Sequence, residues 1–396
     1  MATQNPVFIP GPTNLPDRLR HAMDMQTIDH RAPDFERQFL PLLDDLKQVF
    51  GTATGEVLLF PATGTGGWET AITNTLSPGD TVLAARHGMF SHRWIELCRQ
   101  QGINIQKIET DWGDGVPANA FAEALAEDHE HRIKAVLACH NETATGVTSD
   151  IGAVRSAIDS VDHPAMLFVD GVSSIASMDF RMDDWGVDVA VTGAQKGFML
   201  MPGLAILAFS KRALAATETA TCTRAYFDVP AMCAANRAGS FPYTPPTGLI
   251  RGLSESVSML LEEGLDQVYA RHHHIAEGVR RAVDAWGLRL CANRPELYSD
   301  TVTAICVPSG FDASQLTSHA YARYGVSYGG GLGDVAGKVF RIGHLGDMTE
   351  VMALTGIATA EMAMADLGYP IQRGSGVAAA QRFYGMDSGD NAQEVA

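Results

Sequence analysis

Short runs of apolar residues alternate with longer amphipathic stretches between about residue 56 and residue 210. The runs have the length of strands and are rich in β-branched residues, whereas the stretches between them repeat their apolar residues at helical spacing. The predicted strands are 56–60, 81–85, 103–108, 133–138, 165–169 and 187–192. Strands that alternate with helices favour a mostly parallel, helix-covered sheet, so we predict an α/β fold.

Other patterns flank this region. Residues 7–16 contain three prolines and predict an extended arm, residues 35–50 predict an amphipathic helix, and residues 249–286 predict a long one. After residue 286, helices with short strands at 302–307 and 338–342 indicate a smaller α+β domain, and a glycine-rich segment after Tyr328 predicts a flexible loop. We expect an arm (1–20), a large domain (21–264) and a small domain (265–396) that ends in a loose tail of about twenty residues.

Charged side chains follow two of the predicted strands. Asp170 ends the run 165–169, and Lys196 follows the run 187–192 within four residues. In a mostly parallel sheet, the carboxyl ends of the strands face the crevice where α/β proteins bind ligands. A lysine amine adds to carbonyls and an aspartate can hold a pyridine nitrogen protonated, so the pair predicts a pyridoxal phosphate (PLP) site. By itself, Lys196 is compatible with a surface loop and Asp170 with a turn or helix cap.

Three further segments are candidates for ligand contacts. The glycine-rich residues 61–69 run into a helix predicted at 68–76, where free amides would favour a phosphate, although the spacing matches neither Gly-x-Gly-x-x-Gly nor a P-loop. Phe90 could stack on a flat ring or belong to the core. Arg341, on an apolar strand, needs either a ligand carboxylate or an internal salt bridge. The arm is either an entry strap or a cover whose amides around Gly11 to Asn14 contact the substrate.

The composition narrows the class of partner. The net charge of −17 disfavours nucleic acid and anionic membranes. The six cysteines lack metal-like spacing and suggest buried thiols in a reducing compartment. Three adjacent histidines, 272–274, predict a solvated helix surface because neighbouring helical positions do not share a face. No secretory signal is evident at the start and the most apolar run is too short to span a bilayer, so we expect a soluble cytoplasmic protein. The spacing of the cysteines and histidines predicts no metal site.

Seven stretches occur in the order of one known family. They are residues 10–14, 61–69, 140–146, 169–174, 192–196, 243–246 and 340–346. With these motifs the chain resembles the class V PLP-dependent aminotransferases across nearly its whole length, and within them the serine–glyoxylate and aspartate–glyoxylate group, relatives of alanine–glyoxylate aminotransferase. The resemblance implies the type I PLP transferase fold, transfer of the amino group of L-aspartate or L-serine to glyoxylate, and at least a homodimer with shared active sites.

The resemblance also implies roles by position. Lys196 resembles the lysine that bonds the cofactor as a Schiff base, and Asp170 the partner of the pyridine nitrogen. The remaining roles are phosphate binding by Thr65, Gly66, Gly67 and Gln195, contact of Thr244 with the neighbouring subunit's phosphate, ring stacking by Phe90, a bond from Thr143 to the ring oxygen, and substrate binding by Arg341 and Asn14. In two places the chain departs from the family: Phe241 replaces a tyrosine and Ala194 a serine.

Several alternatives stay open. An aspartate donor would need a second cation, for which Arg31, His92 and Arg93 are candidates, whereas serine would need only a hydroxyl partner. Alanine and aminoethylphosphonate are further donors. A cysteine desulfurase would need a reactive cysteine on a mobile loop of the small domain, whereas Cys291 and Cys306 lie in or beside strand-like runs. A non-catalytic module would be expected to lack a residue such as Lys196.

Overall fold

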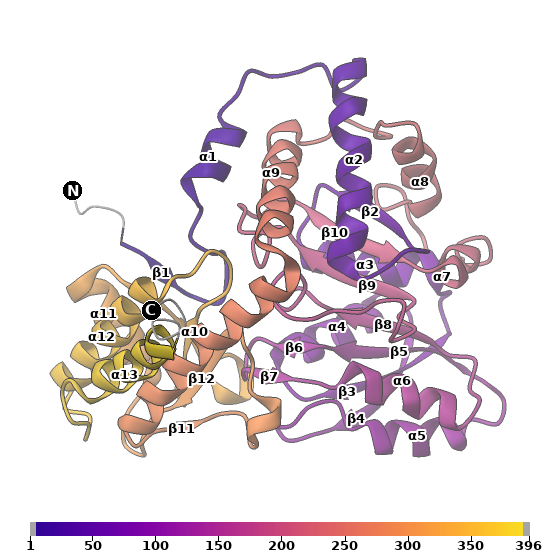
Figure 1. Cartoon of the computed structure of the whole chain (residues 1–396). Helices are drawn as coiled ribbons and strands as arrows, with labels where there is room; N and C mark the ends of the chain where they lie inside the picture. Colours follow the sequence, from indigo (N-terminus) through magenta and orange to yellow (C-terminus); the bar gives the residue numbers. More distant parts are fainter. Residues whose placement is uncertain (1–4, 391–396) are drawn as a thin grey trace.

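The computed structural model describes residues 5–390, organised around two large sheets that each have their own core (Figure 1). The seven-stranded sheet has the order β2-β10-β9-β8-β5-β3-β4, and the five-stranded sheet the order β1-β13-β14-β12-β11. Residues 141–148 add a small hairpin, β6 (Asn141–Glu142) and β7 (Val147–Thr148). This arrangement is the type I PLP transferase fold that the sequence predicts.

The large sheet is mostly parallel. Its strands are β2 (Glu56–Phe60), β3 (Thr81–Arg86), β4 (Asn104–Glu109), β5 (Ile133–Cys139), β8 (Met166–Asp170), β9 (Val189–Gly193) and β10 (Ala205–Phe209). Strand β10 alone runs antiparallel, to both β2 and β9. Five strands coincide with the predicted runs to within one residue at each end and the sixth, β9, to within two. All but β4, which is largely exposed at the edge of the sheet, are mostly buried, and buried strands leave a continuous apolar signature.

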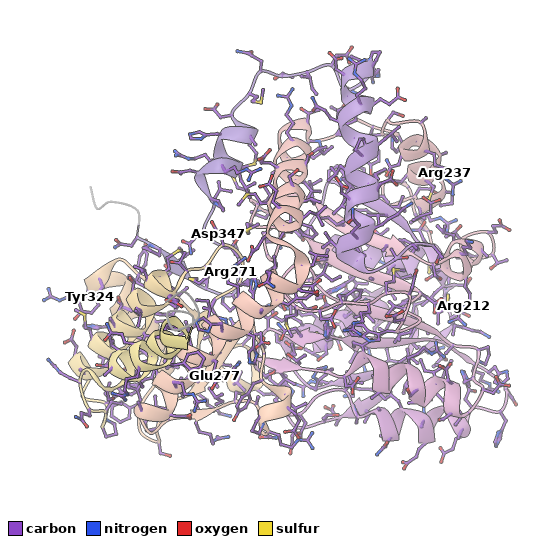
Figure 2. All side chains as sticks on the ribbon, viewed as in Figure 1. Arg212, Arg237, Arg271, Glu277, Tyr324 and Asp347 are labelled. Carbon is purple, nitrogen blue, oxygen red and sulfur yellow. The ribbon has the colours of Figure 1, made fainter. Side chains whose placement is uncertain are left out.

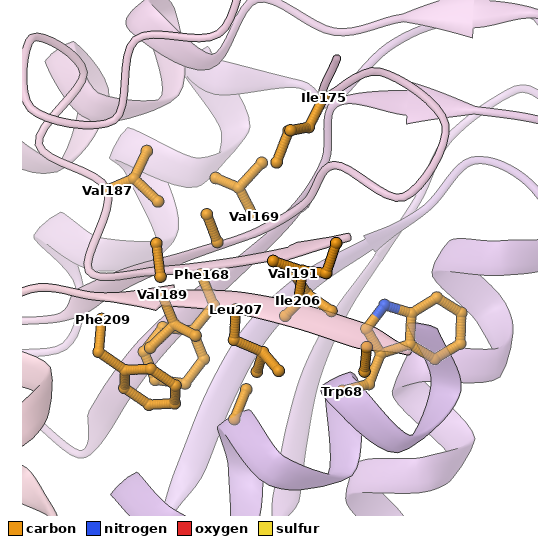
Figure 3. Close-up of a cluster of buried hydrophobic side chains, with 14 of the residues drawn as sticks. Trp68, Phe168, Val169, Ile175, Val187, Val189, Val191, Ile206, Leu207 and Phe209 are labelled. Atoms are coloured by element: carbon orange, nitrogen blue, oxygen red, sulfur yellow. The ribbon is translucent and has the colours of Figure 1, made fainter. Parts of the chain in front are cut away.

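Helices cover this sheet on both faces. They are α2 (Pro33–Phe50), α3 (Gly64–Thr75), α4 (Met89–Gln100), α5 (Ala118–Ala126), α6 (Ile151–Ser160), α7 (Lys211–Ala216), α8 (Val229–Arg237) and α9 (Thr247–Glu263). Figure 3 shows the middle of the core, where Phe168, Val191 and Leu207 of three neighbouring strands and Trp68 of α3 gather. This packing fixes the carboxyl ends of β8 and β9, which carry Asp170 and the lysine loop.

The small domain surrounds the second sheet. Its elements are α10 (Leu265–Ala285), β11 (Arg289–Leu290), β12 (Val302–Cys306), α11 (Ala313–Tyr324), β13 (Ser327–Gly330), β14 (Val339–Gly343), α12 (Glu350–Asp366), α13 (Ser375–Asp390) and two 3-10 turns, Pro295–Leu297 and Gly333–Val335. The N-terminal arm contributes β1 (Val7–Phe8), which pairs in parallel with β13, and Phe8 is fully buried in this core. Helix α1 (Asp17–Met23) then packs on α9.

Arg271 joins the end of α9 to the loop after β14. From α10, where Figure 2 labels it, its Nε ion-pairs with Glu263 Oε1 at 2.6 Å, and its Nη1 donates to Gly346 O at 2.8 Å. The predicted division at residue 264 stays a prediction, although the two cores separate near this point.

Four predictions about local structure were wrong. The long helix divides at Gly264, whose φ of 86° ends α9 and begins α10. Helix α3 begins four residues early, at Gly64. Gly329 and Gly330, the first residues of the predicted loop, belong to strand β13, which pairs with β1 on one side and β14 on the other; the segment leaves the strand after Gly330. The predicted tail is helical up to residue 390, with the Tyr384 hydroxyl donating to Ile275 O at 3.0 Å; its last residues, 391–396, lie outside the described part.

The prediction that histidines 272–274 form a solvated helix surface was also wrong for one of them. His272 is only 1% exposed, with Nδ1 2.7 Å from Val268 O and Nε2 accepting from Gly346 N at 3.0 Å. None of the described helices is long and apolar enough to cross a membrane. The cytoplasmic location stays a prediction.

Candidate active site

Lys196 lies in the turn after β9 and is 8% exposed. Its Nζ donates to Pro10 O, and a Cβ atom on Gly11 would lie 2.5 Å from Lys196 Cδ and 2.9 Å from Nζ. The N-terminal arm therefore passes directly over the amine, and the position of Gly11 has no room for a side chain. The pKa of Lys196 is lowered to about 8: burial is the main cause, the positive charge of Arg341 acts in the same direction, and the charge of Asp170 opposes both. Near neutral pH this amine is far more nucleophilic than a solvated lysine.

Asp170 is the last residue of β8 and is 4% exposed. One carboxylate oxygen accepts from Val172 N at 2.9 Å, and the other accepts from the Cys139 thiol at 3.5 Å. Burial raises the pKa of Asp170 to about 6, with Glu142 adding to the effect and the Val172 amide opposing it. The Val172 amide and the Cys139 thiol are neutral donors, so a protonated ring nitrogen would supply the cationic partner that a buried charge favours.

The start of α3 forms a pocket for an anion. The helix begins at Gly64 after Thr63, whose side chain makes no capping bond, so the amides of its first turn have no intrahelical acceptor. A Cβ atom on Gly193 would lie 2.9 Å from Gln195 Oε1 and 3.4 Å from the Gly64 nitrogen, which places the Gln195 carboxamide beside this turn. Gln195 Oε1 is buried without a hydrogen-bond partner in the described residues. A phosphate fits the helix dipole and the free amides of this turn, and the Gln195 carboxamide can donate to it only through Nε2.

Two residues predicted to contact the ring, Phe90 and Thr143, lie on α4 and between β6 and β7, and their contact with a ring stays a prediction. Phe90, in the first turn of α4, is half-buried, and the Arg93 guanidinium lies 5.5 Å from its ring centroid. The Thr143 hydroxyl shares a 2.7 Å hydrogen bond with the Ser173 hydroxyl. Of the three candidate cations, His92 and Arg93 follow Phe90 on α4, whereas Arg31 lies in the segment between α1 and α2.

Arg341 lies in the middle of β14 and is 7% exposed. Its Nε donates to Gly330 O at 3.0 Å and its Nη1 to Thr143 O at 2.9 Å. Both acceptors are neutral carbonyls, and within residues 5–390 no carboxylate lies at ion-pairing distance. The internal salt bridge that we considered is therefore not formed in this part of the chain. A buried guanidinium in this state suits a ligand carboxylate.

The structure gives less support for two further predicted contacts, that of Asn14 with the substrate and that of Thr244 with the phosphate of a neighbouring subunit. The Asn14 carboxamide bonds both Val7 N and Val7 O at 2.9 Å, so it secures the arm, and its role as a substrate ligand stays a prediction. Thr244 is exposed in a loop of the single chain, where contact with a second subunit stays a prediction as well. Phe241, the departure from the family tyrosine, packs against Phe35 and Phe39 of α2.

Sequence reasoning missed several residues of the site. The Pro10 carbonyl contacts Lys196, the Cys139 thiol contacts Asp170, and Glu142 is fully buried between the site loops. Glu142 lay within a motif that we had singled out, and a charged residue three positions after the end of an apolar strand was the available signal. Cys291 lies in the bend after β11 but is buried, with its thiol on Trp112 O at 3.2 Å, and Cys306 ends β12. Neither is therefore presented on an exposed loop as a desulfurase would require.

The comparison with known proteins decides the family. The profile of the family described as "Aminotransferase class-V" matches residues 21–331. The chain belongs to the class V aminotransferases. It is a PLP-dependent transaminase, and the buried lysine, the buried aspartate and the anion pocket fit that cofactor.

The relatives of this aminotransferase are similar over nearly their whole length. The L-aspartate–glyoxylate aminotransferase of Paracoccus denitrificans is 64% identical over 97% of both chains. The serine–glyoxylate aminotransferase of Hyphomicrobium methylovorum is 51% identical over 96% of this chain and 95% of its own. Among solved structures, pyridoxamine-pyruvate aminotransferase from Mesorhizobium loti superimposes with a TM-score of 0.91 at 27% identity, covering 98% of each chain.

Proposed function

We propose that this aminotransferase moves the amino group of L-aspartate to glyoxylate, giving oxaloacetate and glycine. The observation that carries the proposal is the buried Arg341 guanidinium, which has no acidic partner in residues 5–390 and lies close enough to lower the pKa of Lys196. The 64% identity with an enzyme named for this reaction supports the choice of donor and acceptor. L-Serine is the second candidate donor, supported by the 51% relative.

Each charged residue of the site has a role in this proposal. PLP, when bound, supplies a carbonyl carbon that carries the amino group and a ring that draws electrons away from the substrate Cα. Lys196 would hold the cofactor between turnovers and, when its amine is free, would take the proton from the substrate Cα and return it. Asp170 keeps the ring nitrogen protonated. The first turn of α3, with Gln195, binds the phosphate, and Phe90 stacks on the ring.

Arg341 orients both substrates through the carboxylate that they share. The amino donor and glyoxylate each have a carboxylate next to the reacting carbon, so one guanidinium can serve both half-reactions. The side-chain carboxylate of aspartate needs a second cation, and Arg93, whose guanidinium lies 5.5 Å from the Phe90 ring centroid, is the candidate that we favour. A hydroxyl donor such as serine makes no such demand.

Oligomerisation belongs to the same proposal. Thr244 is exposed, and the motif around it resembles the segment that family members send to the neighbouring subunit's phosphate. We propose a homodimer in which each subunit completes the site of the other.

The test is a half-reaction without an acceptor. The purified enzyme with PLP is mixed with L-aspartate, L-serine or L-alanine, and the visible absorption of bound cofactor is followed together with the 2-oxo acid formed. We expect aspartate to remove the absorption band fastest and glyoxylate to restore it. A band that responds faster to serine would transfer the proposal to the second donor, and a band insensitive to all three would contradict it.

Two variants separate the catalytic and binding roles. Lys196→Ala should abolish turnover, and full activity in this variant would contradict its assignment. Arg341→Ala should raise KM for aspartate and glyoxylate together, because both lose the same contact. An effect on only one of the two substrates would show that the clamp is misassigned.

A further inference from the structure

Glu142 is a fully buried carboxylate without a role in the reaction described above. It lies on β6, beside α4 (Figure 1). Its Oε2 accepts the amide hydrogens of Phe90 at 3.0 Å and Ser91 at 2.9 Å, and its Oε1 accepts that of Ala144 at 3.1 Å. The N-cap residue of α4 is Gly88, which has no side chain to cap the helix. Glu142 therefore caps α4 from another element, with the charge that a helix start favours.

The fit between these two elements leaves no spare space. A Cβ atom on Gly88 would lie 2.1 Å from Glu142 Cγ and 2.2 Å from Cδ. The φ of Gly88 is 178°, an extended conformation open to any residue, so the requirement for glycine here comes from contact with Glu142. The position of α4 relative to β6 is thus set by this carboxylate.

The same carboxylate reaches the support of the substrate clamp. Ala144 N donates to Glu142 Oε1, and the adjacent Thr143 carbonyl accepts from Arg341 Nη1. The negative charge of Glu142 also favours the charged form of the buried Arg341. Phe90 on one side and the Thr143 carbonyl on the other are consequently held by one side chain.

We propose that Glu142 is a positioning residue that fixes the spacing between the stacking ring of Phe90 and the guanidinium of Arg341. Since both ends of this spacing contact ligands, Glu142 aligns the plane of the cofactor ring with the substrate carboxylate. The inference rests on the roles proposed above for Phe90 and Arg341, and its test must distinguish a failure of those roles from its own failure.

The first experiment measures the PLP dissociation constant and the visible circular dichroism of bound cofactor in Glu142→Gln and Glu142→Ala. Glutamine keeps the size but loses the charge and one acceptor, whereas alanine loses every bond. Because hydrogen bonds to charged groups are strong, we expect PLP affinity to fall about tenfold or more in Glu142→Ala. The dichroism of the bound ring should weaken, and KM for both substrates should rise.

Asp312→Asn is the matched control. Asp312 caps α11 in the small domain by accepting from Ser314 N at 2.8 Å, and it touches no residue of the site. This variant should lose thermal stability but keep the PLP affinity, the dichroism and both KM values of the wild type. If Glu142→Gln behaves like Asp312→Asn, Glu142 is only a helix cap and the proposal is wrong.

Gly88→Ala provides an independent test that leaves Glu142 in the sequence. The added methyl should displace the carboxylate and reproduce the loss of PLP affinity. In a Glu142→Ala background the space is free, so the same substitution should add little. Equal effects of Gly88→Ala in both backgrounds would contradict the proposed contact.

Phe90→Ala separates the two levels of inference. If this variant binds PLP like the wild type, the stacking role proposed for Phe90 fails. If it weakens PLP binding and Glu142→Gln does not, the stacking role stands and the inference about Glu142 fails. If both weaken it and the double variant is no worse than Phe90→Ala, Glu142 acts on the cofactor through Phe90, as we infer.

Discussion

At the residue scale, the chemistry depends on the charges that surround one buried amine. Burial lowers the pKa of Lys196 to about 8, so the rate at which apoprotein bonds PLP should rise with pH through a midpoint near 8. Asp170 favours the protonated amine, and Arg341 disfavours it. Asp170→Asn should therefore move the midpoint to lower pH and Arg341→Met to higher pH. Rapid-mixing absorption measurements of PLP attachment would check both directions, and a midpoint that stays fixed in both variants would show that these charges do not control the amine.

At the scale of elements, the N-terminal arm connects the small sheet to the catalytic lysine. Strand β1 anchors the arm through Phe8, which is fully buried and stacks at 5.9 Å on Tyr328, and the next residues pass over Lys196. Phe8→Ala should cost about 3 kcal/mol of stability, as large-to-small core substitutions do, and expose the arm to protease. KM for both substrates should rise more than kcat falls. Steady-state kinetics with limited proteolysis would check this, and an unchanged cleavage pattern together with unchanged KM would contradict the anchoring role.

At the scale of the whole molecule, buried histidines make stability depend on pH. Burial lowers the pKa of His140 and His272 to about 4 and that of His344 to about 3. Below pH 6.5 the unfolded chain binds protons that the folded chain does not, so stability should fall as pH drops from 6.5 towards 4. Asp170, whose pKa is raised from 3.8 to about 6, binds its proton more tightly in the folded chain and so opposes this loss of stability between about pH 6 and pH 3.8. Thermal melting from pH 8 to pH 4 should show the loss, and His272→Gln should reduce its slope; an identical slope would exclude His272 as a contributor.

Much of the fold follows from local sequence. The strands around Asp170 and the lysine loop were predictable because a buried parallel strand is a continuous apolar run, and helix α2 because its apolar residues recur on one face. The helix break at Gly264 and strand β13 were not, because a glycine is compatible with a break, a loop or an edge until its neighbours are known.

The sequence alone determined the α/β class, the family, and the placement of Lys196 and Asp170 at strand ends, since periodicity and short motifs are local properties. Only the tertiary structure decided that the Pro10 carbonyl covers the lysine, that Arg341 has no acidic partner in residues 5–390, that Glu142 caps α4, and that His272 is buried. Each of these facts depends on groups that are distant along the chain or on the burial that packing creates. Desolvation and charge neighbourhood, which set the reactivity of the site, arise when the chain folds.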